Sequence, residues 1–172
     1  MSTLQTKLKI KHYGDPSLRR RAKPLKAVTD KDRATLEEMA ELMRLSGGIG
    51  LAAPQVGISK QMIVVDVGNG VFYLINPRIT KRSGAQKREE GCLSLPGVYV
   101  TVKRPQSVTV TGINEKNEKI CFSAGDLFAR ALQHEIDHLR GRLIIDHTNL
   151  FQRLRMKKQL KVLKERCAHE LF

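Results

Sequence analysis

The stretch QHEIDHLRG, from Gln133 to Gly141, places two histidines four residues apart with an acid directly after the first. Positions i and i+4 share one face of a helix, so the pattern predicts that His134 and His138 bind one metal ion together. Glu135 flanks the pair, where it would handle a proton from metal-activated water. The alternative is a solvated charged helix face that bears the pattern by chance. The helical residues around the stretch favour the metal site.

The composition of the chain is that of a globular protein. Its 172 residues are 41% hydrophobic and 28% charged, which predicts one domain over residues 1–172. No apolar run approaches the length of a membrane span. The N-terminal segment is basic but lacks the apolar core and cleavage site of a signal peptide, which indicates the cytoplasm and leaves an organelle transit peptide open. An odd number of widely spaced cysteines indicates a reducing compartment.

The formal net charge of +14 is large for this length and would attract a polyanion such as RNA. The alternative is a soluble protein with a lysine-rich surface. Lysines and arginines are dense between Arg153 and Lys164, inside a basic segment over residues 148–172 that also carries leucines at helical spacing. That density favours a partner with phosphate groups.

Apolar periodicity and turn residues predict the order of the secondary structure. Helical spacing predicts helices over residues 30–44, from about 125 to 139, and from about 149 to 169. Short runs with β character lie at residues 61–67, 71–76, 98–102 and 107–113, and a short extended piece is expected at 143–147. A helix, several antiparallel strands and then two helices indicate an α+β fold.

A catalytic metal site of this type needs a third protein ligand. The metzincin pattern would require a histidine where the chain has Ile144, and His147 comes three residues late. A thermolysin-type site would take a later glutamate, and Glu165 and Glu170 stand on the basic terminal segment. Cys92 is the better candidate, because EGCLSLPG marks a constrained turn between strands.

Sulfur with two imidazoles suits iron(II), zinc, cobalt or nickel. The segment GGIGLAAPQVG, from Gly47 to Gly57, carries small residues that let a substrate backbone approach closely, and its Gln55 offers an amide donor. The segment lacks the lysine and hydroxyl residue of a phosphate-binding P-loop.

Three segments together, GIGLAAPQVG, EGCLSLP and QHEIDHLRG in that order, resemble the peptide deformylase family. The opening IKHYGDPSLRRRAKPL also resembles the N-terminal region of that family, so the resemblance extends from about Leu8 to the terminal helix. It implies an α+β fold with small antiparallel sheets packed around a central HExxH helix and a long C-terminal helix. It also implies a hydrolase that removes the formyl group from the N-terminal formyl-methionine of nascent bacterial chains.

The resemblance implies a role for each matching residue. The expected cofactor is Fe2+, one per chain, for which Zn2+, Ni2+ or Co2+ would substitute, with Cys92, His134 and His138 as its ligands. Metal-bound hydroxide would attack the formyl carbon. The remaining roles are general acid/base for Glu135, oxyanion stabilisation for Gln55 and the backbone N–H of Leu93, pairing with the substrate backbone for Ile49, Gly50 and Gly91, and walls of the methionine pocket for Leu127 and Ala131.

Further residues concern the surroundings of the metal. Arg104 matches a family arginine and is expected to pair with Glu90, while Asp137 is a second candidate for fixing neighbouring donors. Arg130 stands where the family often has an apolar pocket residue, so its charge must reach water or an acid while its stem lines the pocket mouth. Tyr99 stands where some members carry an arginine. Both departures bear on substrate preference.

Some family members dock on the ribosome through a C-terminal helix. The resemblance therefore predicts that the ribosome, through its RNA or protein, contacts the basic residues of the terminal helix, namely Arg153, Arg155, Lys157, Lys158, Lys161 and Lys164. A solvated face of a packed helix is the alternative. Two other functions remain open from the residues alone. A metallopeptidase would cleave internal peptide bonds, and a non-catalytic RNA-binding protein would bind no metal.

Overall fold

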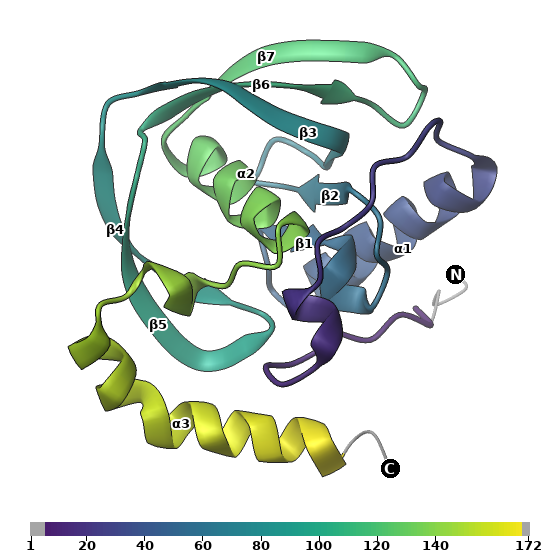
Figure 1. Cartoon of the computed structure of the whole chain (residues 1–172). Helices are drawn as coiled ribbons and strands as arrows, with labels where there is room; N and C mark the ends of the chain where they lie inside the picture. Colours follow the sequence, from purple (N-terminus) through teal and green to yellow (C-terminus); the bar gives the residue numbers. More distant parts are fainter. Residues whose placement is uncertain (1–5, 170–172) are drawn as a thin grey trace.

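A computed structural model describes residues 6–169 of the protein (Figure 1). The helices in this part of the chain are α1 (Asp30–Leu45), α2 (Asp126–Leu139) and α3 (Leu150–His169). The strands are β1 (Gly50–Ala52), β2 (Met62–Val65), β3 (Phe72–Ser83), β4 (Gln86–Cys92), β5 (Leu95–Arg104), β6 (Ser107–Ile113) and β7 (Lys119–Gly125). Short 3₁₀ helices are η1 (Pro16–Arg19), η2 (Ala53–Val56) and η3 (Ile144–His147).

Two antiparallel sheets surround α2, which occupies the centre of the molecule (Figure 1). The larger sheet has the strand order β1-β2-β3-β6-β7, and β4 pairs with β5 in a separate hairpin. Leu132 and Ile136 of α2 pack against Ile63 and Leu74 of the larger sheet in one buried cluster. Helix α1 contributes to a second cluster, also with β2 residues. The α+β prediction with a central helix is confirmed.

The sequence of α2 explains why it forms and where it ends. Ala129, Leu132 and Ile136 recur at helical spacing and are buried on the face that meets the sheet. The helix ends before Gly141, which has a φ of 71°. A Cβ at Gly141 would lie 2.5 Å from the carbonyl oxygen of Arg19, so only glycine permits this close approach.

Strand β3 is longer than the sequence predicts, because it continues past Pro77 to Ser83. Its pairing with β6 shifts register between Ile75 and Arg78, and Asn76 there has a φ of 52°. A proline that lacks an N–H is tolerated at such a bulge, where the ladder is already interrupted. The proline therefore bends the strand instead of ending it.

Asn76 also joins the N-terminal segment to the sheet. Its side-chain amide donates to the carbonyl of Leu25 at 2.8 Å, and its carbonyl oxygen accepts from the Leu25 N–H at 2.9 Å. Asn117 makes the same pair of bonds with Val28, at 3.0 and 2.6 Å. Two asparagines thus act as backbone partners for a segment that is itself outside the strands.

The predicted extended piece at residues 143–147 is wrong. Residues Ile144–His147 form η3, and only Leu143 ahead of it is extended. The carboxylate of Asp146 accepts the N–H of Leu143 at 2.8 Å, and the N–H of Asp146 donates to the carbonyl of Leu143 at 2.9 Å. This capping interaction turns the chain after one residue, although the apolar run LIID reads as a strand.

Helix α3 lies beneath β5 at the edge of the molecule (Figure 1). Leu163 is buried, and Met156 and Leu160 pack beside it against β5 and η3. Gln159 donates to the carbonyl of Gly97 at 2.7 Å. The predicted terminal helix is confirmed through residue 169, while residues 170–172 of that prediction lie outside the described part of the chain. None of the helices in residues 6–169 is long and apolar enough to span a bilayer.

The N-terminus of α1 contains a buried acid whose ionisation stabilises the fold. Asp32 is 2% exposed, and its carboxylate accepts from Lys60 Nζ and from the backbone N–H of Thr29. Burial alone would raise the pKa of Asp32, but the hydrogen bonds from Lys60 and Thr29 outweigh burial and lower it. A lowered folded-state pKa gives stability that is present above the unfolded-state value and is lost as the pH falls through the folded-state value.

Asp32→Asn is therefore expected to lower the free energy of unfolding by about 1–3 kcal/mol at pH 7, because Lys60 loses its charged partner. The difference from wild type should shrink below about pH 4, where the carboxyl group of the unfolded chain takes up a proton. Urea unfolding at neutral and acidic pH measures both. Asp30→Asn, an exposed acid of the same helical turn, is the control and should change little. A difference that does not depend on pH would contradict this account.

Candidate metal centre

Cys92, His134 and His138 meet between the hairpin and the central helix. Cys92 is the last residue of β4, and the two histidines lie one turn apart on α2. Cys92 Sγ lies 3.3 Å from His138 Nε2, which lies 3.2 Å from His134 Nε2. All three ligand atoms lie within 4.8 Å of one another. The turn after β4 thus brings the cysteine to the histidine pair, as the sequence predicts.

The charges around these ligands favour the forms that bind a metal. Burial would raise the pKa of Cys92, but the neighbouring His138 and His134 lower it well below its usual value, which favours the thiolate. Burial would lower the pKa of His134, while hydrogen bonds with Cys92 and Glu90 raise it. The positive charge that is favoured on His134 therefore stabilises the thiolate of Cys92. A divalent cation would take over that role when it displaces the protons.

Glu90 fixes the orientation of His134. Its Oε2 lies 3.1 Å from His134 Nδ1, so the ring directs Nε2 toward the other two ligand atoms. Arg104 donates two hydrogen bonds, of 2.7 and 2.9 Å, to the same carboxylate. Arg130 Nη1 also forms an ion pair with it. Burial alone would raise the pKa of Glu90, but its bonds with His134 and Arg104 lower it to about 2. The predicted pairing of Arg104 with Glu90 is confirmed.

The guanidinium group of Arg130 pairs with an acid, one of the two partners expected for it from the sequence. Its side chain is 7% exposed and lines the pocket, while its guanidinium pairs with Glu90. Arg104 also donates to Asp137 at 2.8 Å, and Asp137 lies 2.9 Å from His147 Nε2. A chain of paired charges thus leads from the metal ligands to the surface.

Glu135 lies beside the ligands with one oxygen unsatisfied. Its side chain is buried, and its Oε2 forms no hydrogen bond with any described residue. Burial is the largest influence on the pKa of Glu135 and raises it. A Cβ on Gly50 would lie 2.4 Å from Glu135 Oε1, so β1 reaches the carboxylate only because this residue is glycine. An unsatisfied buried oxygen of this kind indicates a missing polar partner.

Gln55 is held so that its amide group faces the cysteine. Its Oε1 accepts the N–H of Ala52 at 2.8 Å, which identifies Nε2 as the outward-facing donor. Nε2 lies 3.2 Å from Ser94 Oγ and 3.6 Å from Cys92 Sγ. Ser94, a fully buried hydroxyl two residues after the cysteine, is not among the site residues predicted from the sequence. Its position inside CLSLP, close to the cysteine, is the sequence feature from which a role at the site could have been predicted.

A cavity of about 550 Å³ opens onto the ligands. Each residue that the sequence assigns to substrate contact lines it, together with the acid, amide and two of the ligands, namely Ile49, Gly50, Gln55, Gly91, Cys92, Leu93, Leu127, Arg130, Ala131, His134 and Glu135. His138 is fully buried beneath them. Tyr99 also lines the cavity, and a Cβ on Gly91 would lie 3.0 Å from its ring.

The edges of both sheets face this cavity. Among residues 6–169, strand β1 pairs only with β2 and is the edge of the larger sheet, while β4 pairs only with β5. Gly50 of β1 and Gly91 of β4 both line the cavity. Their unpaired edges leave room for an extended chain to lie between the two sheets.

One thiolate, two imidazoles and an adjacent unsatisfied carboxylate fit a borderline-soft divalent metal with an open position for water. The fold and site thus define a protein with the metal site of a hydrolase of the HExxH class, in which the third ligand is a cysteine.

Comparisons with known proteins identify the family. The model of the polypeptide deformylase family matches residues 7–154. The peptide deformylase of Carboxydothermus hydrogenoformans is 51% identical over 138 residues, which covers 80% of this chain and 91% of that protein. The crystal structure of peptide deformylase from Thermotoga maritima matches with a TM-score of 0.81 and 43% identity, over 83% of this chain and 97% of that one. A plant peptide deformylase matches with a TM-score of 0.90 and 34% identity, over 99% and 96%. The chain belongs to the polypeptide deformylase family.

The ligand set predicts the optical spectrum of a cobalt-loaded protein. Wild type titrated with Co2+ should show a thiolate-to-cobalt charge-transfer band, because Cys92 is the sulfur ligand. Cys92→Ser should lose that band, whereas Cys121→Ser, which alters an exposed cysteine on β7, should keep it. Absorption titration under anaerobic conditions measures the band. A band that persists in Cys92→Ser would exclude Cys92 as the ligand.

Proposed function

We propose that this protein is a peptide deformylase that hydrolyses the formyl group from the N-terminal formyl-methionine of newly synthesised chains. The observation that carries the proposal is the cluster of Cys92, His134 and His138, with the buried acid Glu135 beside it, at the end of a cavity. Membership of the polypeptide deformylase family supports the same reaction. Bacterial relatives such as the peptide deformylase of Carboxydothermus hydrogenoformans support action in the bacterial cytoplasm.

The substrate backbone would bind as an added strand. Gly50 offers the unpaired edge of β1, Ile49 lies directly before it, and Gly91 of β4 lines the same cavity. Backbone hydrogen bonds of this kind hold any sequence in register, so specificity must come from the first side chain. Leu127 and Ala131 line the cavity from α2 and would contact the methionine side chain. Arg130 would add the methylene stem of its side chain, because its guanidinium is occupied by Glu90.

Three groups of the chain would carry the chemistry. Gln55 Nε2 and the backbone N–H of Leu93 would donate to the oxygen of the formyl group, where negative charge develops. Glu135 would take a proton from the attacking water and pass it to the nitrogen of the leaving amine. Burial raises the pKa of Glu135. A raised pKa suits that task, because a group that both accepts and donates a proton works best when its pKa lies near the ambient pH.

We propose Fe2+ as the metal, with Zn2+, Ni2+ or Co2+ as substitutes, held by Cys92, His134 and His138. When bound, the metal would supply Lewis acidity that makes water a nucleophile near neutral pH. The thiolate donor supports a borderline-soft cation over magnesium or calcium. Glu90 would keep the His134 ring in the required orientation through Nδ1.

Glu135→Gln tests the proposal directly. The variant should keep its metal, because Glu135 is no ligand, while kcat for formyl-Met-Ala-Ser falls about 10²–10⁴-fold. Release of formate by anaerobically purified, iron-loaded protein is the measurement. Acetyl-Met-Ala-Ser should not react with either protein. Glu89→Gln, at an exposed acid that also lines the cavity, should behave as wild type.

The same assay separates deformylation from peptidase activity. A metallopeptidase would cleave the Met-Ala bond and would accept free or acetylated N-termini. Metal-loaded wild type that releases amino acids but no formate would overturn the proposed reaction.

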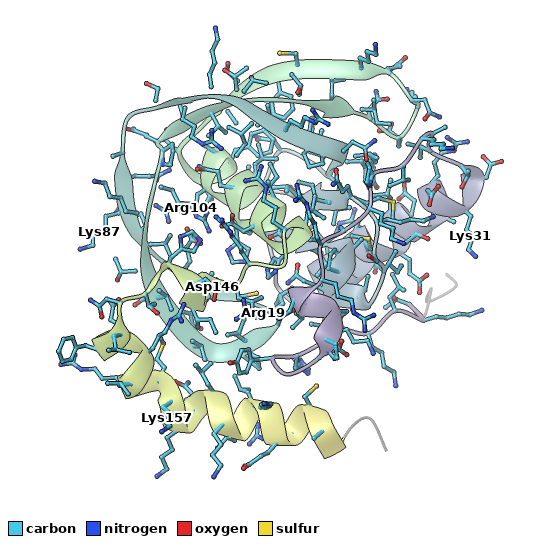
Figure 2. The ribbon with its side chains drawn as sticks, in the orientation of Figure 1. Arg19, Lys31, Lys87, Arg104, Asp146 and Lys157 are labelled. Atoms are coloured by element: carbon cyan, nitrogen blue, oxygen red, sulfur yellow. The ribbon has the colours of Figure 1, made fainter. Side chains whose placement is uncertain are left out.

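We further propose that α3 contacts the ribosome. The buried side of α3 packs on the body through Leu163. The exposed cations of α3 include Arg153, Arg155, Lys157, Lys158, Lys161 and Lys164. Figure 2 shows Lys157 on α3 at the edge of the molecule. Cations on one helix would contact phosphates of ribosomal RNA or acidic protein near the emerging chain.

Charge removal tests this contact better than truncation, because truncation would also uncover Leu163. Replacement of Lys157, Lys158 and Lys161 by glutamine should reduce co-sedimentation with ribosomes and leave hydrolysis of the short formyl peptide unchanged. The matched control replaces three exposed lysines on β3 and the β6–β7 hairpin, Lys81, Lys116 and Lys119. Equal loss of binding in both variants would mean that net charge alone is responsible.

A further inference from the structure

A second basic surface lies at the C-terminal end of α2, apart from the outward cations of α3. It consists of four exposed arginines, here called the arginine patch, which are Arg20, Arg21, Arg140 and Arg142. The segment after η1 runs beside the end of α2, where the N–H of Ala22 donates to the carbonyl of Leu139 at 2.9 Å. Gly141 permits this contact, because any side chain there would meet the backbone of Arg19.

The positive charge of the arginine patch is only partly offset, by the attraction of Arg20 to Asp15, whose pKa it helps to lower. Within residues 6–169, none of its four members forms an ion pair with a described residue. The nearby acids are already engaged. Asp15 caps η1 and faces Lys11 at 3.8 Å, Asp137 is bound by Arg104, and Asp146 lies between Arg19 and Arg153. A cluster of unpaired guanidinium groups repels itself, so it is best explained by an anionic partner.

The chemistry of the patch favours RNA over a membrane. Arginine presents a planar fork that binds phosphate oxygens in pairs, which suits a regular phosphate backbone. A peripheral membrane surface usually inserts large apolar side chains beside its cations. In the described part of the chain, the exposed large hydrophobic residues lie elsewhere, on α1, α3, β5, the start of α2 and the loop before β1. The patch therefore presents positive charge without a large exposed apolar side chain that could insert into a membrane.

The position of the patch leaves the cavity free. Leu127 lines the cavity at the start of α2, and Arg140 follows its last turn, about 20 Å further along the axis at 1.5 Å per residue. Arg19, which precedes the patch, pairs with Asp146, and Asp146 also pairs with Arg153 of α3. A partner bound at the patch would lie along one side of the molecule and would not cover the substrate entrance.

We infer that the arginine patch is a binding surface for the phosphate backbone of double-stranded RNA. The four guanidinium groups bind phosphates without reading bases, so affinity depends on salt and not on sequence. This surface does not depend on which substrate the cavity takes, and it does not require the lysines of α3.

Binding of the full-length, metal-loaded protein to a short fluorescent RNA duplex tests the inference by anisotropy over a series of salt concentrations. Replacement of all four patch arginines by glutamine should raise Kd about tenfold or more near physiological salt and lower the slope of log K against log salt by about three. The matched control removes four exposed cations from β3 and β4, which are Arg78, Lys81, Arg82 and Arg88. It should keep most of the affinity and slope.

Two double variants, Arg20→Gln with Arg21→Gln and Arg140→Gln with Arg142→Gln, keep the test valid if the quadruple variant is unstable. Each should lose part of the slope, and release of formate shows that each is folded. Equal weakening of the patch and control variants would overturn the inference, because only net charge would then matter. Unchanged RNA binding with loss of binding to phosphatidylglycerol vesicles would overturn it in favour of a membrane surface.

Discussion

The buried carboxylate of Glu90 is the interaction on which the rest of the site depends. It receives two bonds from Arg104, an ion pair from Arg130 and a bond with the ring of His134, so it links β4, β5 and α2 at one point. A carboxylate at 6% exposure is stable only when its charge is fully matched. Loss of one partner from such a buried network typically costs about 3–5 kcal/mol, because the remaining charges stay buried. The hairpin that carries the cysteine is therefore fixed to the helix that carries the histidines.

The same carboxylate connects stability to chemistry. Because Glu90 engages Nδ1 of His134, the Nε2 atom is left to face Cys92 and His138, as a metal ligand must. Arg104 continues the network to Asp137, one residue before His138 on α2. The orientation of the ligands thus follows from ion pairs that also hold the sheets and the helix together. The metal ligands and the packing of the sheets against α2 depend on the same ion pairs. A substitution that breaks one of these ion pairs is therefore expected to disturb both.

The sequence predicted those parts that depend on local pattern. The spacing of His134 and His138 placed both on one helix face, and the turn residues around Cys92 marked the end of a strand. Strand β4 was missed because QKREEGC is polar and becomes a strand through pairing with β5. The spacing of apolar residues in the sequence does not show that β4 pairs with β5. For Arg130 the sequence predicted that an acid or water must receive the charge, but only the three-dimensional structure shows that Glu90 lies within reach.

The close approach of β1 to α2 explains how the proposed site would select a small acyl group. A single added carbon at Gly50 would overlap Glu135, so the strand edge and the carboxylate form one closely packed wall of the cavity. A peptide paired with β1 would be held along its length, and its blocked N-terminus would lie against Glu135 and the ligands. A formyl group adds one carbon and one oxygen to that end, whereas acetyl adds a methyl group as well. Discrimination would then follow from the room beside this wall, together with the lower electrophilicity of the acetyl carbonyl.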